Sequence, residues 1–270
     1  MPELPEIETV RRGLRAAVVG RRIAAVTVRD RRLRRPVLRS FAPALVGRRI
    51  EDVRRRAKYL LLDLDDDRVW LVHLGMSGTL AVLPAAVPLR QHTHVIATLD
   101  DGRTLRFHDP RRFGLMRVGA LAELEELACL GVEPLGAAFT PAFLHAVARR
   151  QRRAIKSLLM DQCIVAGLGN IYVNEILFAA GIRPGRRTSR LSRADAARIV
   201  AATGTVLADA IAARGSSISD YRDEQGEPGA FQDRFRVYEC AGRACRSCGT
   251  PIRRRVIVGR SSFYCPRCQR

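Results

Sequence analysis

Residues 245–268 read Cys-Arg-Ser-Cys-Gly-Thr-Pro-Ile-Arg-Arg-Arg-Val-Ile-Val-Gly-Arg-Ser-Ser-Phe-Tyr-Cys-Pro-Arg-Cys, and they decide the fold of the C-terminal part of the chain. The two Cys-x-x-Cys pairs stand 16 residues apart, a spacing typical of a closed four-thiolate zinc site. The residues between them alternate enough to predict a β-hairpin with its turn near Gly259 and Arg260 at its tip. We therefore expect one structural Zn²⁺, held by Cys245, Cys248, Cys265 and Cys268.

This zinc would be structural rather than catalytic, because four thiolates leave no open coordination position. The same cysteine spacing also permits an iron–sulfur cluster or a redox pair in place of zinc. A basic tip on a rigid hairpin suits contact with a phosphate or a nucleic-acid groove.

The charge of the chain favours a polyanionic partner. Its 270 residues carry a formal net charge of +20, with a pI of about 11.1, and a globular protein this basic most simply binds nucleic acid. The basic residues are spread over the chain, so part of this charge is explained by a general preference of the source for arginine rather than by a binding site. Arg supplies 45 of the 47 basic residues. The two Lys and two Asn of the chain are site candidates because they are so scarce: Lys58, Lys156, Asn170 and Asn174.

Length and hydropathy limit the class of protein. The length suits one large domain or two ordinary ones, and no run of about 18 apolar residues predicts a membrane span. The start of the chain is acidic and lacks the apolar region of a signal peptide. We therefore expect a cytoplasmic protein.

The segment Met1-Pro-Glu-Leu-Pro-Glu6 suggests amine chemistry. Removal of Met1 would expose the secondary amine of Pro2, and an α-amino group with a pKa of roughly 8 is partly neutral near neutral pH. Such an amine can attack a sugar aldehyde carbon to form an iminium ion, with Glu3 beside it as an acid or base. The alternative is that proline and glutamate only open a helix.

The order of expected elements predicts an α+β fold. A helix over 5–18 precedes a strand over 23–28 and two hairpins, 59–64 with 68–72 and 93–99 with 103–107. We expect these segments to form an antiparallel β-sandwich with a leading helix. After residue 120 the pattern becomes helical, at 141–150, 153–163, 171–181 and 191–213. Residues 214–227 lack periodicity and predict a linker or a lid over a pocket.

Three glycine-containing turns are candidates for DNA contact. Gly167-Leu-Gly-Asn170 precedes a helix, whose first N–H groups would cradle an anion while Asn170 caps it. His73-Leu-Gly-Met-Ser-Gly78 and Asp109-Pro-Arg-Arg-Phe-Gly114 carry Met76, Arg111 and Phe113. Apolar side chains on turns can be ordinary core residues, but they can also be wedges that unstack bases when a nucleotide is flipped out.

Taken together, these segments resemble the formamidopyrimidine-DNA glycosylases, bacterial enzymes that excise oxidised purines. The similarity covers essentially the whole chain. Leu4 and the wedge residues resemble this branch rather than the sister endonuclease VIII branch. The similarity to the family is carried by residues 2–6, 55–62, 73–78, 109–114, 154–162, 167–172, 245–252 and 263–269.

The resemblance implies three domains: an N-terminal catalytic β-sandwich over 1–130, a helix-two-turn-helix domain over 131–235 and a zinc hairpin over 236–270. It implies a monomer that binds damaged double-stranded DNA, with one structural Zn²⁺ and no organic cofactor.

The resemblance also implies residue roles. Pro2 would attack C1′ of the damaged nucleotide and Glu3 would be the proton donor and shuttle. Lys58 would be the proton donor for β-elimination and Arg260 for δ-elimination. The phosphates would be held by Lys58, His73, Asn170 and Arg260. The gap left by the flipped nucleotide would be filled by Met76, Phe113 and Arg111, with Arg111 facing the orphaned cytosine.

Other implied sites are less specific. The base pocket would be bordered by Glu6 and by the loop that includes Ser217 and Tyr221. Further DNA contacts would come from His92, Lys156 and Tyr238.

Three rival functions stay open at this point: an endonuclease VIII-like enzyme for oxidised pyrimidines, a catalytically silent zinc DNA-binding protein, and an RNA-binding zinc module. A silent binder needs neither Pro2 nor Glu3, and an RNA module needs no wedge turns.

Overall fold

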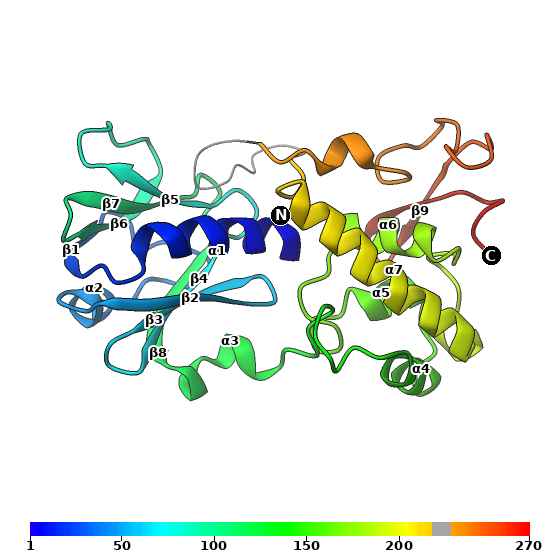
Figure 1. Cartoon of the computed structure of the whole chain (residues 1–270), viewed down its shortest axis with the longest axis horizontal. Coiled ribbons are helices and arrows are strands. Elements are labelled where there is room, and N and C mark those ends of the chain that lie inside the picture. The colour runs from blue at the N-terminus through cyan, green and yellow to red at the C-terminus, as the bar shows by residue number, and fades with distance from the viewer. Residues whose placement is uncertain (218–227) are drawn as a thin grey trace. The chain divides into compact units, whose positions relative to one another are not determined.

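The computed structural model describes residues 1–217 and 228–270. The chain divides into two compact units. The N-terminal unit comprises residues 1–128 and 213–230, and the C-terminal unit comprises residues 129–212 and 231–270 (Figure 1). Among the described residues, no helix has the length and apolar character needed to cross a membrane.

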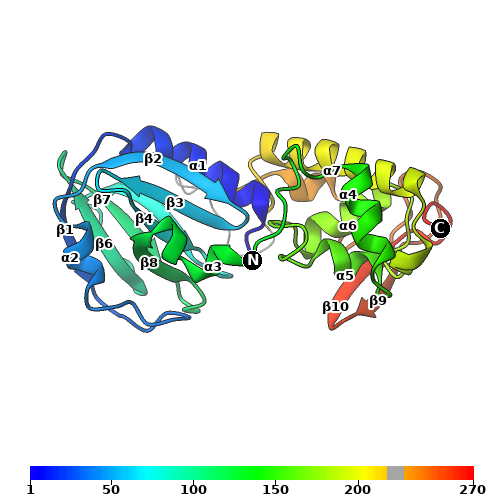
Figure 2. The same ribbon diagram turned by 90° about the horizontal axis from the view of Figure 1, so that it is seen from below.

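The N-terminal unit is a β-sandwich preceded by helix α1, Leu4–Val18. One antiparallel sheet has the order β1-β6-β7-β5 and the other β2-β3-β4-β8 (Figure 2). Short helices α2, Phe41–Leu45, and α3, Glu125–Ala128, complete the unit. The strands are β1, Ile23–Val28; β2, Ile50–Arg56; β3, Tyr59–Leu64; β4, Arg68–His73; β5, Thr79–Pro84; β6, Thr93–Leu99; β7, Arg103–His108; and β8, Leu115–Ala120.

One core joins the two sheets and the helix. Helix α1 contributes Ile7, Val10 and Leu14, spaced along one face, and the sheets contribute residues such as Trp70 and Phe107, both fully buried. Burial of each such apolar side chain contributes roughly 1.5–3 kcal/mol. The predicted sandwich, leading helix and two hairpins are confirmed, and the strand register aligns Tyr59 with His73.

The C-terminal unit is helical. Its helices are α4, Pro141–Arg149; α5, Ile155–Leu159; α6, Asn170–Ala179; and α7, Arg193–Ala212. The prediction of a helix over 153–163 was too long, because α5 ends at Leu159. Beyond that end, the Gln162 side chain bonds to the loop, accepting from Gly167 N at 2.8 Å and donating to Leu168 O at 2.8 Å.

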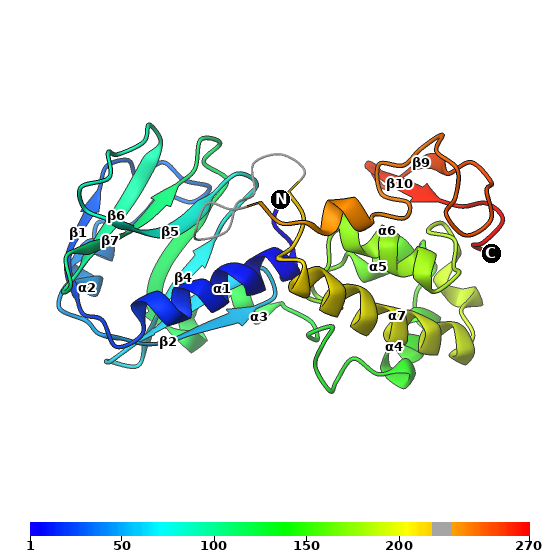
Figure 3. The same cartoon turned by 45° about the horizontal axis from the view of Figure 1, so that its top comes forward.

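The chain closes with the predicted hairpin, β9, Arg253–Ile257, and β10, Arg260–Tyr264, which pair Arg260 with Ile257 across the turn. Figure 3 shows this hairpin beside α6, and α6 contacts β10. Short 3₁₀ turns cover Leu121–Glu123, Thr188–Arg190 and Phe231–Arg234.

Candidate active site and zinc centre

The N-terminal end of α1 holds two buried carboxylates. Pro2 is buried, and Glu3 and Glu6 are 3% and 1% exposed. The Glu3 backbone N–H donates to Glu6 Oε2 at 2.7 Å, while Glu6 Oε1 accepts from Ser216 N at 2.7 Å and from Ser216 Oγ at 3.1 Å. Such donors stabilise a carboxylate that burial would otherwise destabilise. Glu6 therefore joins the start of the chain to the segment after α7.

The amino terminus lies among predicted site residues. The Met1 side chain is about half exposed, but its amine is largely buried, and this burial lowers the amine's pKa below the ordinary value of 8.0. The carboxylates of Glu3 and Glu6 raise that pKa, whereas the cations Lys58 and Arg111 lower it. The net decrease leaves more of the amine neutral and nucleophilic at neutral pH.

Lys58 and His73 are both buried, and the charge of Lys58 acts on the terminal amine and on His73. Lys58 follows Ala57 in the turn between β2 and β3 and is 6% exposed. Burial, followed by the charges of Lys58 and Arg34, lowers the pKa of His73 to about 4. Its Nδ1 accepts a hydrogen bond from Gly75 N at 2.9 Å. His73 is therefore neutral at pH 7, with its proton on Nε2, and can donate to an anion without carrying charge.

The two predicted wedge turns pack against each other. A Cβ atom on Gly75, where φ is +68°, would lie 2.4 Å from the backbone carbon of Phe113, so only glycine allows this approach. Fully buried Asp109 joins the same turns, accepting from Ser77 Oγ at 2.9 Å and from Gly114 N at 2.7 Å. The turns therefore form one platform.

The platform exposes the three predicted wedge residues. Met76 is 36% and Phe113 44% exposed, and the Arg111 guanidinium carbon lies 4.9 Å from the centroid of the Phe113 ring. His92 lies at the base of the same platform, since its backbone oxygen accepts from Asp109 N at 3.0 Å. Large apolar side chains held at the surface by a rigid support are suited to wedge insertion.

Of the predicted pocket loop, Ser217 is described and Tyr221 lies outside the described residues, as does most of the predicted linker or lid. Ser216 forms a bridge with Ala230, and Ser217 Oγ accepts from Gly229 N at 2.9 Å. These contacts join the two ends of the segment, while Ser216 is bound to Glu6.

In the C-terminal unit, Asn170 occupies a different helix position from the one predicted. Gly169 is the N-cap of α6 and Asn170 is its first residue, so Asn170 does not cap the helix. Its Oδ1 atom is buried with no hydrogen-bond partner among the described residues. The helix start still presents backbone N–H groups suited to an anion, and the prediction of capping was wrong because glycine takes the extended N-cap conformation here.

Two of the scarce residues support the zinc hairpin. Lys156 is 1% exposed, and its Nζ donates to Ser261 O at 2.6 Å and to Ser262 Oγ at 2.8 Å. Fully buried Asn174 accepts from Phe263 N at 2.8 Å through Oδ1. Both contacts fix β10, the strand that begins at exposed Arg260.

Tyr238 lies in a row of aromatic rings. Its ring centroid is 5.4 Å from that of Phe235 and 5.3 Å from that of Phe263. Its backbone N–H donates to Glu175 Oε1 at 2.8 Å. Burial raises the pKa of Glu175, although bonds from the backbone of residues 236–238 oppose that change.

The four cysteines meet at one point. Their Sγ atoms all lie within 4.8 Å of one another, with 3.9 Å between Cys245 and Cys268 and 3.5 Å between Cys248 and Cys265. Tetrahedral zinc with bonds of about 2.3 Å requires sulfur atoms about 3.8 Å apart. The set is thus one structural zinc site, as predicted. Gln269, which sequence reasoning missed, braces it by accepting from Cys265 N at 2.8 Å.

A buried amino terminus, a wedge platform and a zinc hairpin together are typical of a class of protein that acts on nucleic acid. Three family patterns match the chain: the formamidopyrimidine-DNA glycosylase N-terminal domain over residues 1–116, the formamidopyrimidine-DNA glycosylase H2TH domain over 130–222, and a zinc finger found in FPG and IleRS over 242–270. The chain belongs to the formamidopyrimidine-DNA glycosylase family.

Similar proteins agree over the full length. The formamidopyrimidine-DNA glycosylases of Thioalkalivibrio sulfidiphilus and Methylococcus capsulatus are 49% and 47% identical, with 100% of each chain covered. The crystal structure of MutM (FPG) from Thermus thermophilus is 41% identical with a TM-score of 0.89, covering 99% of this chain and 98% of that one. A Lactococcus lactis FPG mutant in complex with Fapy-dG-containing DNA is 32% identical with a TM-score of 0.91, covering 100% of both.

Proposed function

We propose that this enzyme excises oxidised purines, 8-oxoguanine and formamidopyrimidines, from double-stranded DNA through a Schiff base on Pro2, and then cleaves the strand by β,δ-elimination. The observation that carries the proposal is the buried position of Pro2 directly before α1, beside the buried carboxylates Glu3 and Glu6. Removal of Met1 makes the Pro2 nitrogen the terminus of the same buried segment.

The chemistry needs no organic cofactor. The Pro2 nitrogen forms a bond to C1′, and the bond from C1′ to the base breaks with its electron pair going to the leaving base. Glu3 supplies a proton as the sugar ring opens to the iminium ion. Loss of a C2′ proton then expels the 3′ phosphate, and a second elimination expels the 5′ phosphate. We assign Lys58 as proton donor in the first elimination and Arg260 in the second.

DNA recognition uses residues of both units in this proposal. Met76, Arg111 and Phe113 fill the space that the flipped nucleotide leaves in the duplex. Without them the nucleotide would return to that space and stack on its neighbours. Phosphate contacts come from Lys58, His73, Asn170 and Arg260. His73 is a neutral donor there, because its pKa is about 4.

The same proposal assigns the remaining site residues. Glu6, Ser217 and Tyr221 border the base pocket, and His92 and Tyr238 add DNA contacts. Lys156 supports DNA contact indirectly, by holding β10 through Ser261 and Ser262. Zinc supplies no chemistry, since it only holds the hairpin that carries Arg260. We also propose domain boundaries at 130 and 235, a monomeric state, and a cytoplasmic, nucleoid-associated location.

The test compares chemistry with binding. Pro2→Gly retains a terminal amine but loses the secondary amine of proline, so excision of 8-oxoguanine opposite cytosine should fall far more than DNA affinity. Equal loss of excision and affinity would contradict the assignment of Pro2. Faster excision of thymine glycol than of 8-oxoguanine by the unaltered enzyme would contradict the purine assignment.

A further inference from the structure

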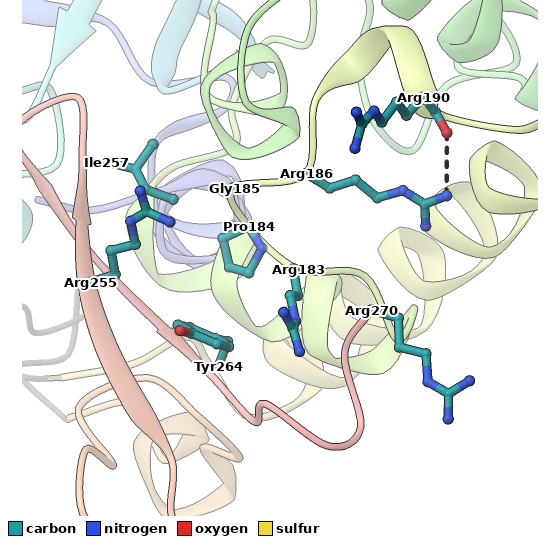
Figure 4. A pocket seen from close by; sticks show the side chains of 9 residues that line it. All are labelled: Arg183, Pro184, Gly185, Arg186, Arg190, Arg255, Ile257, Tyr264 and Arg270. Atoms are coloured by element: carbon teal, nitrogen blue, oxygen red, sulfur yellow. Dashed lines mark hydrogen bonds between the residues drawn. The ribbon is translucent and has the colours of Figure 1, made fainter.

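A cationic cavity of about 500 Å³ lies in the C-terminal unit (Figure 4). It is lined by the segment between α6 and α7, by both strands of the zinc hairpin and by the last residue of the chain. None of the residues proposed above to contact the lesion DNA lines it. Among the described lining residues there is no carboxylate side chain, although Arg270 also carries the terminal carboxylate of the chain. The five cations are Arg183, Arg186, Arg190, Arg255 and Arg270.

Two of these arginines are structural. Arg183 donates through Nε to Gln269 O at 2.8 Å and through Nη2 to Pro266 O at 2.9 Å. Arg186 pairs with Asp195 at 2.8 Å and donates to Arg190 O at 3.2 Å. These contacts fix the wall of the cavity, and Asp195 shares its single negative charge between Arg186 and Arg198, whose Nη2 lies 2.6 Å from its Oδ1.

The other three guanidinium groups have no such role. Arg190, Arg255 and Arg270 are exposed, and within the described residues their side chains form no hydrogen bond or ion pair. They come from three separate segments of the chain yet line the same cavity. Like charges brought together repel each other unless an anion lies among them.

The cavity is also lined by an aromatic ring, that of Tyr264, and by Gly185. Figure 4 shows the Tyr264 ring between the side chains of Arg255 and Arg183. At Gly185 an added Cβ would lie 3.6 Å from Ile257 Cδ1 and 3.9 Å from Arg255 Nη1. A small side chain would therefore fit at position 185, whereas a long one would enter the cavity.

We propose that this cavity is a second anion site, which takes a phosphate-bearing ligand. Guanidinium forks match phosphate oxygens in pairs, and a cavity of this size suits a pyrophosphate or a mononucleotide, whose base could stack on Tyr264. The same chemistry would accept a phosphate of a nucleic-acid strand outside the lesion site. A small phosphate compound and a nucleic-acid strand would both be bound through a phosphate group, and they differ in the length of the molecule that carries it.

The first experiment titrates the full-length, zinc-loaded protein with sodium pyrophosphate and with AMP by calorimetry, alone and saturated with a short lesion duplex. The test variant is Arg190→Ala/Arg255→Ala. The matched control is Arg187→Ala/Arg253→Ala, which removes the same charge from the same two segments at exposed positions that do not line the cavity. We expect one site per chain, weakened at least about tenfold in the test variant, which loses the charge-assisted hydrogen bonds of two guanidinium groups, and unchanged in the control.

The second experiment distinguishes the source of the phosphate. If the site holds a nucleic-acid strand, a long undamaged duplex will bind more tightly than a short one, and the test variant alone will lose that gain, with a salt slope smaller by about 1 for each lost phosphate. Gly185→Glu should abolish the effect in either case, and single-turnover excision should be unchanged in every variant. The proposal is wrong if the test and control variants behave alike with both probes, or if a hexaglutamate peptide binds the cavity and phosphates do not.

Discussion

The wedge platform depends on Asp109, and its removal gives the sharpest structural prediction. Asp109 is fully buried and accepts from Ser77 Oγ on one turn and from Gly114 N on the other. Asp109→Ala removes both acceptors and leaves a buried hydroxyl and a buried N–H without partners. The turns that present Met76 and Phe113 would then lose their common support.

The magnitude follows from those two bonds. A buried polar group left without its hydrogen-bond partner costs about 1–3 kcal/mol, so the alanine variant should lose about 2–6 kcal/mol of unfolding free energy. Native proteins are stable by only about 5–15 kcal/mol. Asp109→Asn is the matched control, because its Oδ1 can accept from Gly114 N while its amide donates to Ser77 Oγ, which retains both contacts.

Urea unfolding and single-turnover excision of 8-oxoguanine measure the two consequences. The alanine variant should unfold at lower urea and excise more slowly under conditions where it is still folded, and the asparagine variant should lie close to the unaltered enzyme. An alanine variant as stable and active as the asparagine variant would refute the role given to Asp109.

Three further predictions concern pH, a glycine and zinc. The pKa of His73 is about 4 in the folded protein and about 6.5 in the unfolded chain. Between pH 6.5 and pH 4 the unfolded chain therefore binds a proton that the folded protein does not. About 3 kcal/mol of unfolding free energy is present above pH 6.5 and is lost as the pH falls to 4. His73→Gln should flatten that part of the pH–stability curve, and an unchanged curve would contradict the assignment. Gly215→Ala meets Glu6 Oε1 at 2.7 Å with φ at +79° and should be more destabilising in urea than Gly242→Ala, which has φ of +81° and open space; equal losses would remove the steric argument. Chelation of zinc should abolish DNA binding in a gel-shift assay while the terminal amine still reacts with a small aldehyde, and retained binding would show that the hairpin does not need its metal.

Much of the fold could be predicted because its signals are local. The acidic turn at 65–67 and the Asp101-Gly102 turn marked two hairpins whose strands begin and end within a residue of the prediction. Strand β2 had no comparable signal, since its sequence Ile-Glu-Asp-Val-Arg-Arg-Arg does not alternate. Its pairing with β3 depends on the sheet rather than on its own residues.

The candidate site was harder to predict where partners are far apart in the chain. Scarcity singled out Lys156 and Asn174, but their bonds to Ser261 and Phe263 span 105 and 89 residues, which no local pattern encodes. The structural roles of Asp109 and Gln162 could not be predicted from their residue types. Both depend on side-chain hydrogen bonds to other turns and loops, and those of Gln162 lie beyond the end of α5. Asn170 was mistaken for a cap because the sequence does not tell which residue of the Gly-Asn pair takes the extended conformation.

The central claim is that Pro2 is the nucleophile, and borohydride trapping tests it most directly. The purified enzyme is mixed with a duplex that carries one 8-oxoguanine opposite cytosine, and borohydride reduces any iminium to a stable amine. The account predicts a covalent adduct that peptide mapping locates at Pro2, with Met1 absent. A duplex that binds without forming an adduct, or an adduct at a lysine, would contradict it.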